Sequence, residues 1–198
     1  MNIAMLLEMA AEGMGDRIAV GPRRAGVSYA ELLERSRRIA SLVEAAGVDR
    51  LGYVDVNSDA VPVLLFASAI AGVPFAPLNY RLADERLRSL GGRIAPAVVV
   101  ADDVTVDRLA GVDGLDTLTY AELTERVTGA GAEDDGHPDP DQVAIWLFTS
   151  GTSGEPKAAL LRHRHLVSYV LSTATSSATT SAGAIRSLTE RRRSSASR

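Results

Sequence analysis

Cysteine is absent from this chain of 198 residues, which excludes disulfide bonds, thiolate metal sites and a cysteine nucleophile. This absence is compatible with a reducing compartment, and we expect a cytoplasmic protein. An excess of positive charge is also lacking, because the formal net charge is −4, so composition gives no reason to expect a nucleic acid partner. Lysine is almost absent, since every basic residue except Lys157 is an arginine.

A membrane span is not predicted, although residues 60–80 contain no charge. A helix of that length could cross a bilayer of about 30 Å, but Gly72, Pro74 and Pro77 would break it after residue 71. We therefore predict a buried helix followed by a buried strand. The first 15 residues lack a basic leader and carry Glu8 and Glu12, which indicates an amphipathic helix rather than a signal peptide.

Predicted helices and apolar strands alternate along the chain. Ser28 and Glu31 have the spacing of a capping box, and Gly47 marks the end of the helix that follows. The further predicted elements are a strand over 51–56, a helix capped by Ser58 that ends at 71, a strand over 73–78, a helix over 84–90 stopped by two glycines, and strands over 98–100 and 118–120. This alternation predicts an α/β fold with a mainly parallel sheet and helices on both faces.

Two segments differ from this pattern in composition. Residues 129–141 are rich in glycine, proline and acids, which predicts a solvated linker rather than a metal site. Residues 171–198 are rich in serine, threonine and arginine and show no apolar periodicity, so we expect a disordered tail after a domain over residues 1–170. The abrupt change suggests a frameshift or truncation, a hypothesis that the sequence of the locus would test.

The most informative stretch is a polar loop between two apolar runs. Residues 143–148 and 158–161 both read as strands, so the loop joins a strand–loop–strand unit. Its backbone N–H groups can converge on phosphate oxygens, its glycines allow close approach, and Lys157 adds a cation. The spacing is not the Walker pattern, and from the residues alone an ordinary polar hairpin remains open. The candidate cofactor-binding residues of this loop are Thr149, Ser150, Gly151, Thr152, Ser153, Gly154 and Lys157.

The segment FTSGTSGEPKAALLRHRHL resembles the phosphate-binding signature of the adenylate-forming (AMP-binding) enzymes, with His163 at the position of the family's histidine. Upstream, VSYAELLERSRRIASLVEAAGV and AGVPFAPLNYRLADERLRSL are similar to two earlier family segments, in the right order. Together these matches cover most of residues 20–170. The run LNYRL and the order Thr-Ser-Gly resemble acyl-CoA ligases more than peptide-synthetase adenylation domains.

The resemblance implies an ATP-dependent ligation in two steps. A small-molecule carboxylic acid attacks the α-phosphorus of ATP, and the acyl group of the resulting adenylate then passes to coenzyme A. Residues 149–154 and Lys157 would hold the leaving pyrophosphate, whose charge Mg²⁺ would neutralise. The implied fold is the N-terminal part of the adenylate-forming fold, roughly the first third by family length.

The chain also departs from the family pattern. Ala158 replaces the usual glycine, no Tyr-Gly-x-Thr-Glu segment is found, no aspartate can be assigned to the ribose, and Lys157 leaves no lysine for the family's C-terminal role. We therefore expect that the 198 residues alone are not catalytically competent. The alternative is an inactive remnant that binds polyphosphate weakly or associates with a partner. Oligomeric state stays open.

Three rival sites are less favoured. His163 and His165 would share a face of a strand, but only His137 could be a further imidazole ligand for zinc. Asp102 and Asp103 would point apart on an extended chain, as surface charges do. Ser150 and Ser153 lack a base, which argues against a hydrolase. The arginines of the tail could contact nucleic acid, but we expect no nucleic acid partner.

Overall fold

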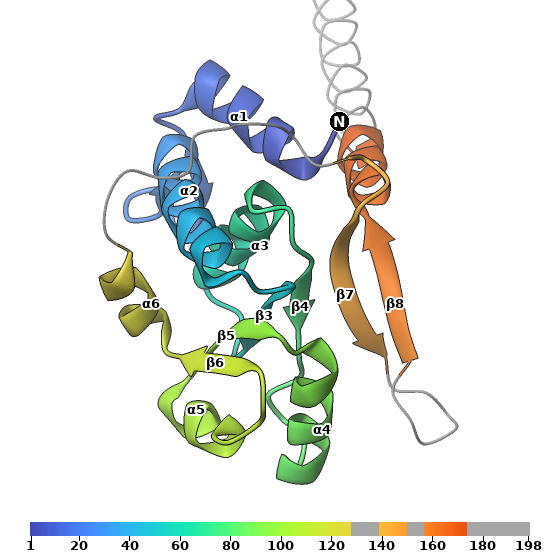
Figure 1. The fold of residues 1–198 in the computed structure, drawn as a ribbon. Helices are drawn as coiled ribbons and strands as arrows, with labels where there is room; N and C mark the ends of the chain where they lie inside the picture. Colours follow the sequence, from blue (N-terminus) through green and yellow to red (C-terminus); the bar gives the residue numbers. More distant parts are fainter. Residues whose placement is uncertain (128–138, 150–156, 174–198) are drawn as a thin grey trace, which may run out of the picture.

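A computed structural model describes residues 1–127, 139–149 and 157–173. Its main feature is a six-stranded sheet in the order β6-β5-β3-β4-β7-β8 (Figure 1). The strands are β3 (Arg50–Val54), β4 (Phe75–Pro77), β5 (Ala97–Ala101), β6 (Leu115–Leu118), β7 (Val143–Thr149) and β8 (Lys157–Arg162). The first five of these strands in the sheet order are parallel, and β8 is antiparallel to β7. The predicted mainly parallel sheet is confirmed.

Helices cover both faces of this sheet, as predicted. One face carries α1 (Ile3–Met14), α2 (Tyr29–Ala46), α3 (Ala60–Ile70) and α6 (Tyr120–Arg126), and the other carries α4 (Asp84–Ile94) and α5 (Asp103–Leu109). The alternation of side chains along β3 explains the two layers. Leu51 and Tyr53 join the cluster under α2 and α3, whereas Val54 joins the cluster under α4 and α5, because successive strand residues point to opposite faces.

The predicted capping box of α2 is confirmed. The Glu31 amide donates to Ser28 Oγ over 3.2 Å, and the Ser28 amide donates to the Glu31 carboxylate over 2.8 Å. The helix ends at Gly47, whose φ of 60° is the left-handed value that glycine adopts without steric cost. Before α2, a short hairpin of β1 (Ile18–Val20) and β2 (Val27–Ser28) was not predicted.

The charge-free segment forms a helix and a strand, as predicted. α3 ends at Ile70, Gly72 has a φ of 69°, and β4 follows at Phe75. Ser58 is not the N-cap residue, which is Asp59, but Ser58 Oγ accepts a hydrogen bond from the Ala60 amide over 3.3 Å. No helix in the described part of the chain is long and apolar enough to cross a membrane.

The prediction that α4 stops at its glycine pair was wrong. The helix continues through Gly91 and Gly92 to Ile94. A Cβ on Gly91 would lie 3.1 Å from Leu115 and 3.2 Å from Leu109. The absence of a side chain there lets α4 lie close to α5 and β6, so Gly91 serves packing rather than termination.

Two short helices, α5 and α6, were missed. Asp102 was interpreted as surface charge, but its carboxylate accepts from the Thr105 amide over 2.7 Å and caps α5. The strand predicted over 118–120 ends at Leu118, and Thr119 forms a capping box with Glu122 at the start of α6. The signal was present, because Thr119 precedes the same Tyr-Ala-Glu-Leu run that follows Ser28.

After β8 the chain turns into a helix over residues 163–173. His163 and His165 therefore do not share a strand face, and residues 171–173, where the tail was expected to begin, continue this helix. Figure 1 places the start of α1 beside it, and Ile3 and Ala4 form an apolar cluster with Val167. The predicted tail from residue 174 onward and most of the predicted linker lie outside the described residues.

Candidate functional site

The β7–β8 hairpin carries the predicted phosphate-binding loop. Thr149 and Lys157 are register partners at the loop end of this hairpin, and both are exposed. Thr149 Oγ1 donates to the Lys157 carbonyl over 3.2 Å. The strand–loop–strand prediction is confirmed up to these two residues. The other predicted loop residues, Ser150, Gly151, Thr152, Ser153 and Gly154, lie outside the described part of the chain.

The hydroxyl of Thr149 has a structural task in this arrangement. Its hydrogen is used by the Lys157 carbonyl, so the hydroxyl is left as an acceptor. Phosphate oxygens are acceptors too and need donors. Of these two residues beside the loop, Lys157 is therefore the one whose side chain can donate to a phosphate. Thr149 links the two strands where the loop begins.

The loop end of the hairpin lies at the carboxyl edge of the parallel strands. β7 is the neighbour of β4 in the sheet, so the segment that follows β4 emerges at the same edge as Thr149. In that segment Asn79 Oδ1 accepts from the Arg81 amide over 3.0 Å, and Arg81 Nε donates to the Tyr80 hydroxyl over 3.0 Å. Ligands of open α/β sheets bind outside the carboxyl ends of the strands. The fold thus places the loop where such ligands bind.

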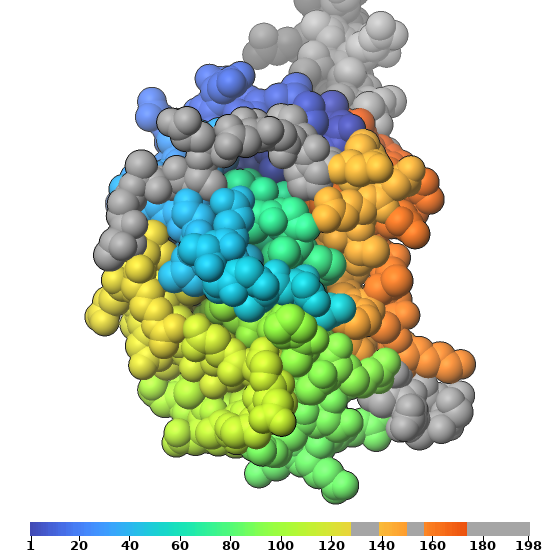
Figure 2. Space-filling model, in the orientation of Figure 1, coloured from blue at the N-terminus to red at the C-terminus, as the bar shows by residue number. Residues whose placement is uncertain are grey.

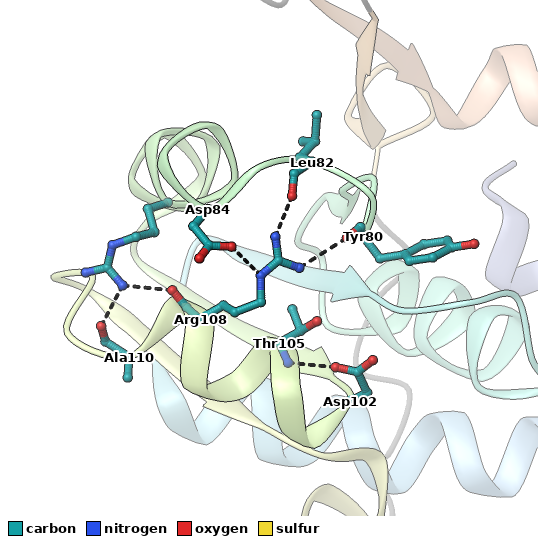
Figure 3. A network of polar contacts seen from close by, with 8 residues as sticks. Tyr80, Leu82, Asp84, Asp102, Thr105, Arg108 and Ala110 are labelled. Atoms are coloured by element: carbon teal, nitrogen blue, oxygen red, sulfur yellow. Dashed lines mark hydrogen bonds and ion pairs between the residues drawn. The ribbon is translucent and has the colours of Figure 1, made fainter.

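An arginine network fixes the segment after β4 (Figure 3). Arg108, on α5, donates to Asp84 Oδ1 over 2.6 Å, to the Tyr80 carbonyl over 3.2 Å and to the Leu82 carbonyl. Arg88 in turn donates to the carbonyls of Arg108 and Ala110, at 2.8 Å each. Hydrogen bonds from a charged group contribute about 1.5–3 kcal/mol, so this network holds residues 80–82 against α4 and α5. Because α5 was missed, Arg108 was missed too.

Two further arginines stabilise β7 from the α4 side of the sheet. The Arg50 guanidinium lies 4.2 Å from the Trp146 ring centre, and that of Arg93 lies 5.1 Å from the Phe148 ring. The two rings are 5.7 Å apart. Each cation–π contact contributes about 0.5–2 kcal/mol. β7, which leads into the loop, is thus anchored through Trp146 and Phe148, two side chains on the same face of the strand.

His163 lies away from the loop end of the hairpin. It follows the last residue of β8, whereas Lys157 is the first, and a strand of that length spans about 20 Å. Its side chain is 1% exposed, and Nδ1 has no hydrogen-bond partner among the described residues. The structure therefore does not bring His163 together with Thr149 and Lys157. Its predicted contact with the nucleotide gains no support from this position.

The buried imidazole of His163 predicts a pH dependence of stability. Burial lowers the pKa of His163, and the positive amino terminus adds to this effect. The unfolded chain, with a histidine pKa of about 6.5, then takes up the proton first. The free energy of unfolding should therefore be fully retained above that value and fall as the pH drops through it. Urea unfolding of the chain at several pH values measures this effect.

The matched variants are His163→Leu, which removes the buried imidazole, and His165→Gln, which removes an exposed one. We expect the first variant to flatten the dependence below about pH 6.5 and the second to keep it. An unchanged slope in His163→Leu would contradict this assignment.

No group of three or more histidine, cysteine, aspartate or glutamate side chains within the described ranges could hold a metal ion. The carboxyl edge carries both signs of charge: Asp55 and Asp102 directly follow β3 and β5, whereas cations lie on the side of the hairpin. Lys157 follows the β7–β8 loop, Arg81 is the first basic residue after β4, and both are exposed. The hairpin side of this edge suits an anionic ligand.

Comparison with known proteins identifies the family. A family model described as AMP-binding enzyme matches residues 7–188 of this chain. The chain belongs to the AMP-binding enzyme family. The resemblance predicted from the three sequence segments is confirmed, and the match covers β7, Lys157 and β8.

Relatives of this AMP-binding chain are much longer than it is. A feruloyl-CoA synthase from Amycolatopsis sp is 34% identical over 148 residues, which are 71% of this chain and 29% of that protein. An N-(5-amino-5-carboxypentanoyl)-L-cysteinyl-D-valine synthase from Amycolatopsis lactamdurans is 29% identical over 85% of this chain and 5% of its own length. The chain thus spans less than a third of either relative.

A solved structure shows the same fold. ATP-bound MatB from Rhodopseudomonas palustris has a TM-score of 0.70 and 31% identity, over 86% of this chain and 37% of that chain. This likeness confirms the predicted α/β class and assigns the sheet to the adenylate-forming fold.

Proposed function

We propose that this chain is the N-terminal part of an ATP-dependent acid–CoA ligase, in which the β7–β8 hairpin binds the phosphates of ATP. The observation that carries the proposal is the position of Lys157. It is exposed at the loop end of the β7–β8 hairpin. This end lies at the carboxyl edge of the sheet, where the segment after β4 also emerges. The relative named feruloyl-CoA synthase and the order of residues Thr149–Gly151 support the acyl-CoA type.

In the proposed reaction a carboxylate oxygen attacks the α-phosphorus of ATP and pyrophosphate leaves. A thiol then attacks the acyl carbon and AMP leaves. Lys157 would donate to the β- and γ-phosphate oxygens, where negative charge increases as the bond breaks. Mg²⁺ would share this charge when bound. Thr149 would contribute by closing the hairpin, which presents Lys157 at a fixed place.

In this proposal the nucleotide binds at the same carboxyl edge of the sheet. The Lys157 ammonium is available, because no described residue forms an ion pair with it. The network of Arg108 holds residues 80–82, which keeps the second segment at this edge of the sheet in place. The described residues offer no candidate for contacts with adenine, ribose or the acyl group, and those contacts would come from elsewhere in a longer protein.

A chimera tests the proposal. Residues 1–170 would replace the matching part of the feruloyl-CoA synthase, which is 34% identical over the shared region. With ATP, Mg²⁺, coenzyme A and a panel of carboxylic acids that includes ferulate, we expect pyrophosphate release and a coenzyme A thioester in the mass spectrum. The separate 198-residue chain should release none.

The rival interpretation is an inactive remnant that at most binds polyphosphate weakly. A chimera that folds by circular dichroism but releases no pyrophosphate with any acid would favour the remnant.

A further inference from the structure

A second candidate site lies between α2 and α6, on the α2 face of the sheet. These helices are side by side in Figures 1 and 2, α2 in blue and α6 in yellow. They border an open pocket of about 230 Å³, lined by Arg35, Arg38, Ile39, Tyr120, Thr124 and Val127. α6 follows β6, which is at the opposite end of the sheet from β8. The pocket is therefore separate from the hairpin of Lys157.

Two polar groups of the pocket are accessible to a ligand, because Arg35 is exposed and Tyr120 is half-buried. Neither the Arg35 guanidinium nor the Tyr120 hydroxyl has a hydrogen-bond or ion-pair partner among residues 1–127, 139–149 and 157–173. The nearby Glu31 carboxylate accepts from the Ser28 amide in the capping box, and the Arg35 charge contributes to lowering the pKa of Glu31 without a direct ion pair between them. Arg38 pairs with Glu34, one turn away on α2. Arg35 is thus the cation that this pocket leaves available for a ligand.

The charges around the pocket favour a ligand that accepts hydrogen bonds. Burial raises the pKa of Tyr120, and Asp59 raises it further while Arg35 lowers it. The phenol therefore remains protonated at neutral pH and can donate. Thr124 Oγ1 donates to the Ala121 carbonyl over 2.7 Å, so its hydrogen is already used. Arg35 and Tyr120 supply two donors from different helices.

The rest of the lining is apolar. Ile39 is 2% exposed, and it lines the pocket together with Val127 and the Tyr120 ring. The pocket is smaller than the roughly 300–1,000 Å³ of sites for drug-sized ligands, which favours a ligand smaller than a nucleotide. An inorganic anion would leave the apolar part of the lining without contacts. The lining therefore matches a small molecule with one anionic end and one apolar end.

We propose that the pocket between α2 and α6 binds a small carboxylate carried on an apolar group, with Arg35 and Tyr120 on the carboxylate and Ile39 and Val127 against the apolar part. The planar guanidinium can donate two parallel hydrogen bonds to a carboxylate. This site is independent of the proposed ligase function, because none of its lining residues belongs to the hairpin or to the segment after β4.

Benzoate is the probe for this site. Titrated into the ¹⁵N-labelled full chain, it should give saturable shifts at the amides of Arg35, Tyr120 and Thr124. Arg35→Gln should raise the dissociation constant at least about tenfold, as expected for the loss of a charged hydrogen bond. Arg24→Gln removes the same charge from an exposed residue outside the pocket and should leave the constant unchanged. Circular dichroism checks that both variants fold.

Two further probes separate the parts of the proposal. Benzyl alcohol lacks the charge and inorganic phosphate lacks the apolar group, so each should bind at least about tenfold more weakly than benzoate. Tyr120→Phe, which removes only the hydroxyl, should also weaken benzoate binding and serves if Arg35→Gln misfolds.

The proposal is overturned by the absence of saturable benzoate binding, by shifts confined to the hairpin around Lys157, or by equal binding in the Arg35 and Tyr120 variants. Equal binding of either comparison probe overturns it as well. None of these outcomes affects the chimera experiment, which reads pyrophosphate, so the two proposals can fail separately.

Discussion

Lys157→Met is expected to lower pyrophosphate release by the chimera roughly 10- to 100-fold, the range for loss of a hydrogen bond from a charged donor. Methionine keeps a long unbranched side chain but has neither the charge nor a donor. Because Lys157 is exposed and pairs with Thr149 through backbone atoms, the hairpin itself should survive. The measurement is the rate of pyrophosphate release against ATP concentration, with Mg²⁺ in excess.

The matched controls for this variant are Arg164→Met and Lys157→Arg. Arg164 is an exposed cation beyond the other end of β8, paired with Asp141, so its loss should leave the rate within about twofold. Lys157→Arg keeps the charge with a different donor geometry and should give an intermediate rate. If the methionine variant of the active chimera turns over as fast as the parent, the phosphate-binding role of Lys157 is wrong.

Leu64→Ala is expected to lower the free energy of unfolding of the chain by about 2–5 kcal/mol, the range for truncating a fully buried leucine. Leu64 lies on α3, is 0% exposed and belongs to the apolar cluster that joins α2 and α3 to the sheet. The deletion removes apolar contacts and leaves a cavity that the close-packed neighbours can fill only in part. Equilibrium urea unfolding measures this change.

The control for the core variant is Val104→Ala on α5. Val104 is 70% exposed, so its truncation removes little buried surface and should change stability by less than about 0.5 kcal/mol. A Leu64→Ala variant as stable as the Val104→Ala variant would mean that α3 does not pack against the sheet as described.

Much of the fold could be predicted from local patterns. The capping box of Ser28 and Glu31, the left-handed Gly47 and the apolar run of β5 each depend on residues close in sequence, and the structure has all three. The misses were of two kinds. α5 and α6 are short, so their capping signals at Asp102 and Thr119 were outweighed by a reading as surface charge and strand.

The second kind of miss depends on residues far apart in the chain. Gly91 was predicted to stop α4, because glycine often ends helices. It lies inside α4 since Leu109 and Leu115 occupy the space that a side chain would need. Likewise, Arg108 could not be linked to the carbonyls of Tyr80 and Leu82 before the packing of α5 against the segment after β4 was known.

The sequence alone determined the family and the alternation of helices and strands, and it predicted the phosphate-binding loop that Lys157, the one lysine, directly follows. These follow from spacing and residue type, which act locally. The tertiary structure decided that the Thr149 hydroxyl donates to the Lys157 carbonyl within the hairpin and that His163 is buried at the far end of β8. It also decided that Arg35 and Tyr120 line the same pocket. Burial and hydrogen-bond partners depend on which distant segments pack together, and only the folded chain brings those segments into contact.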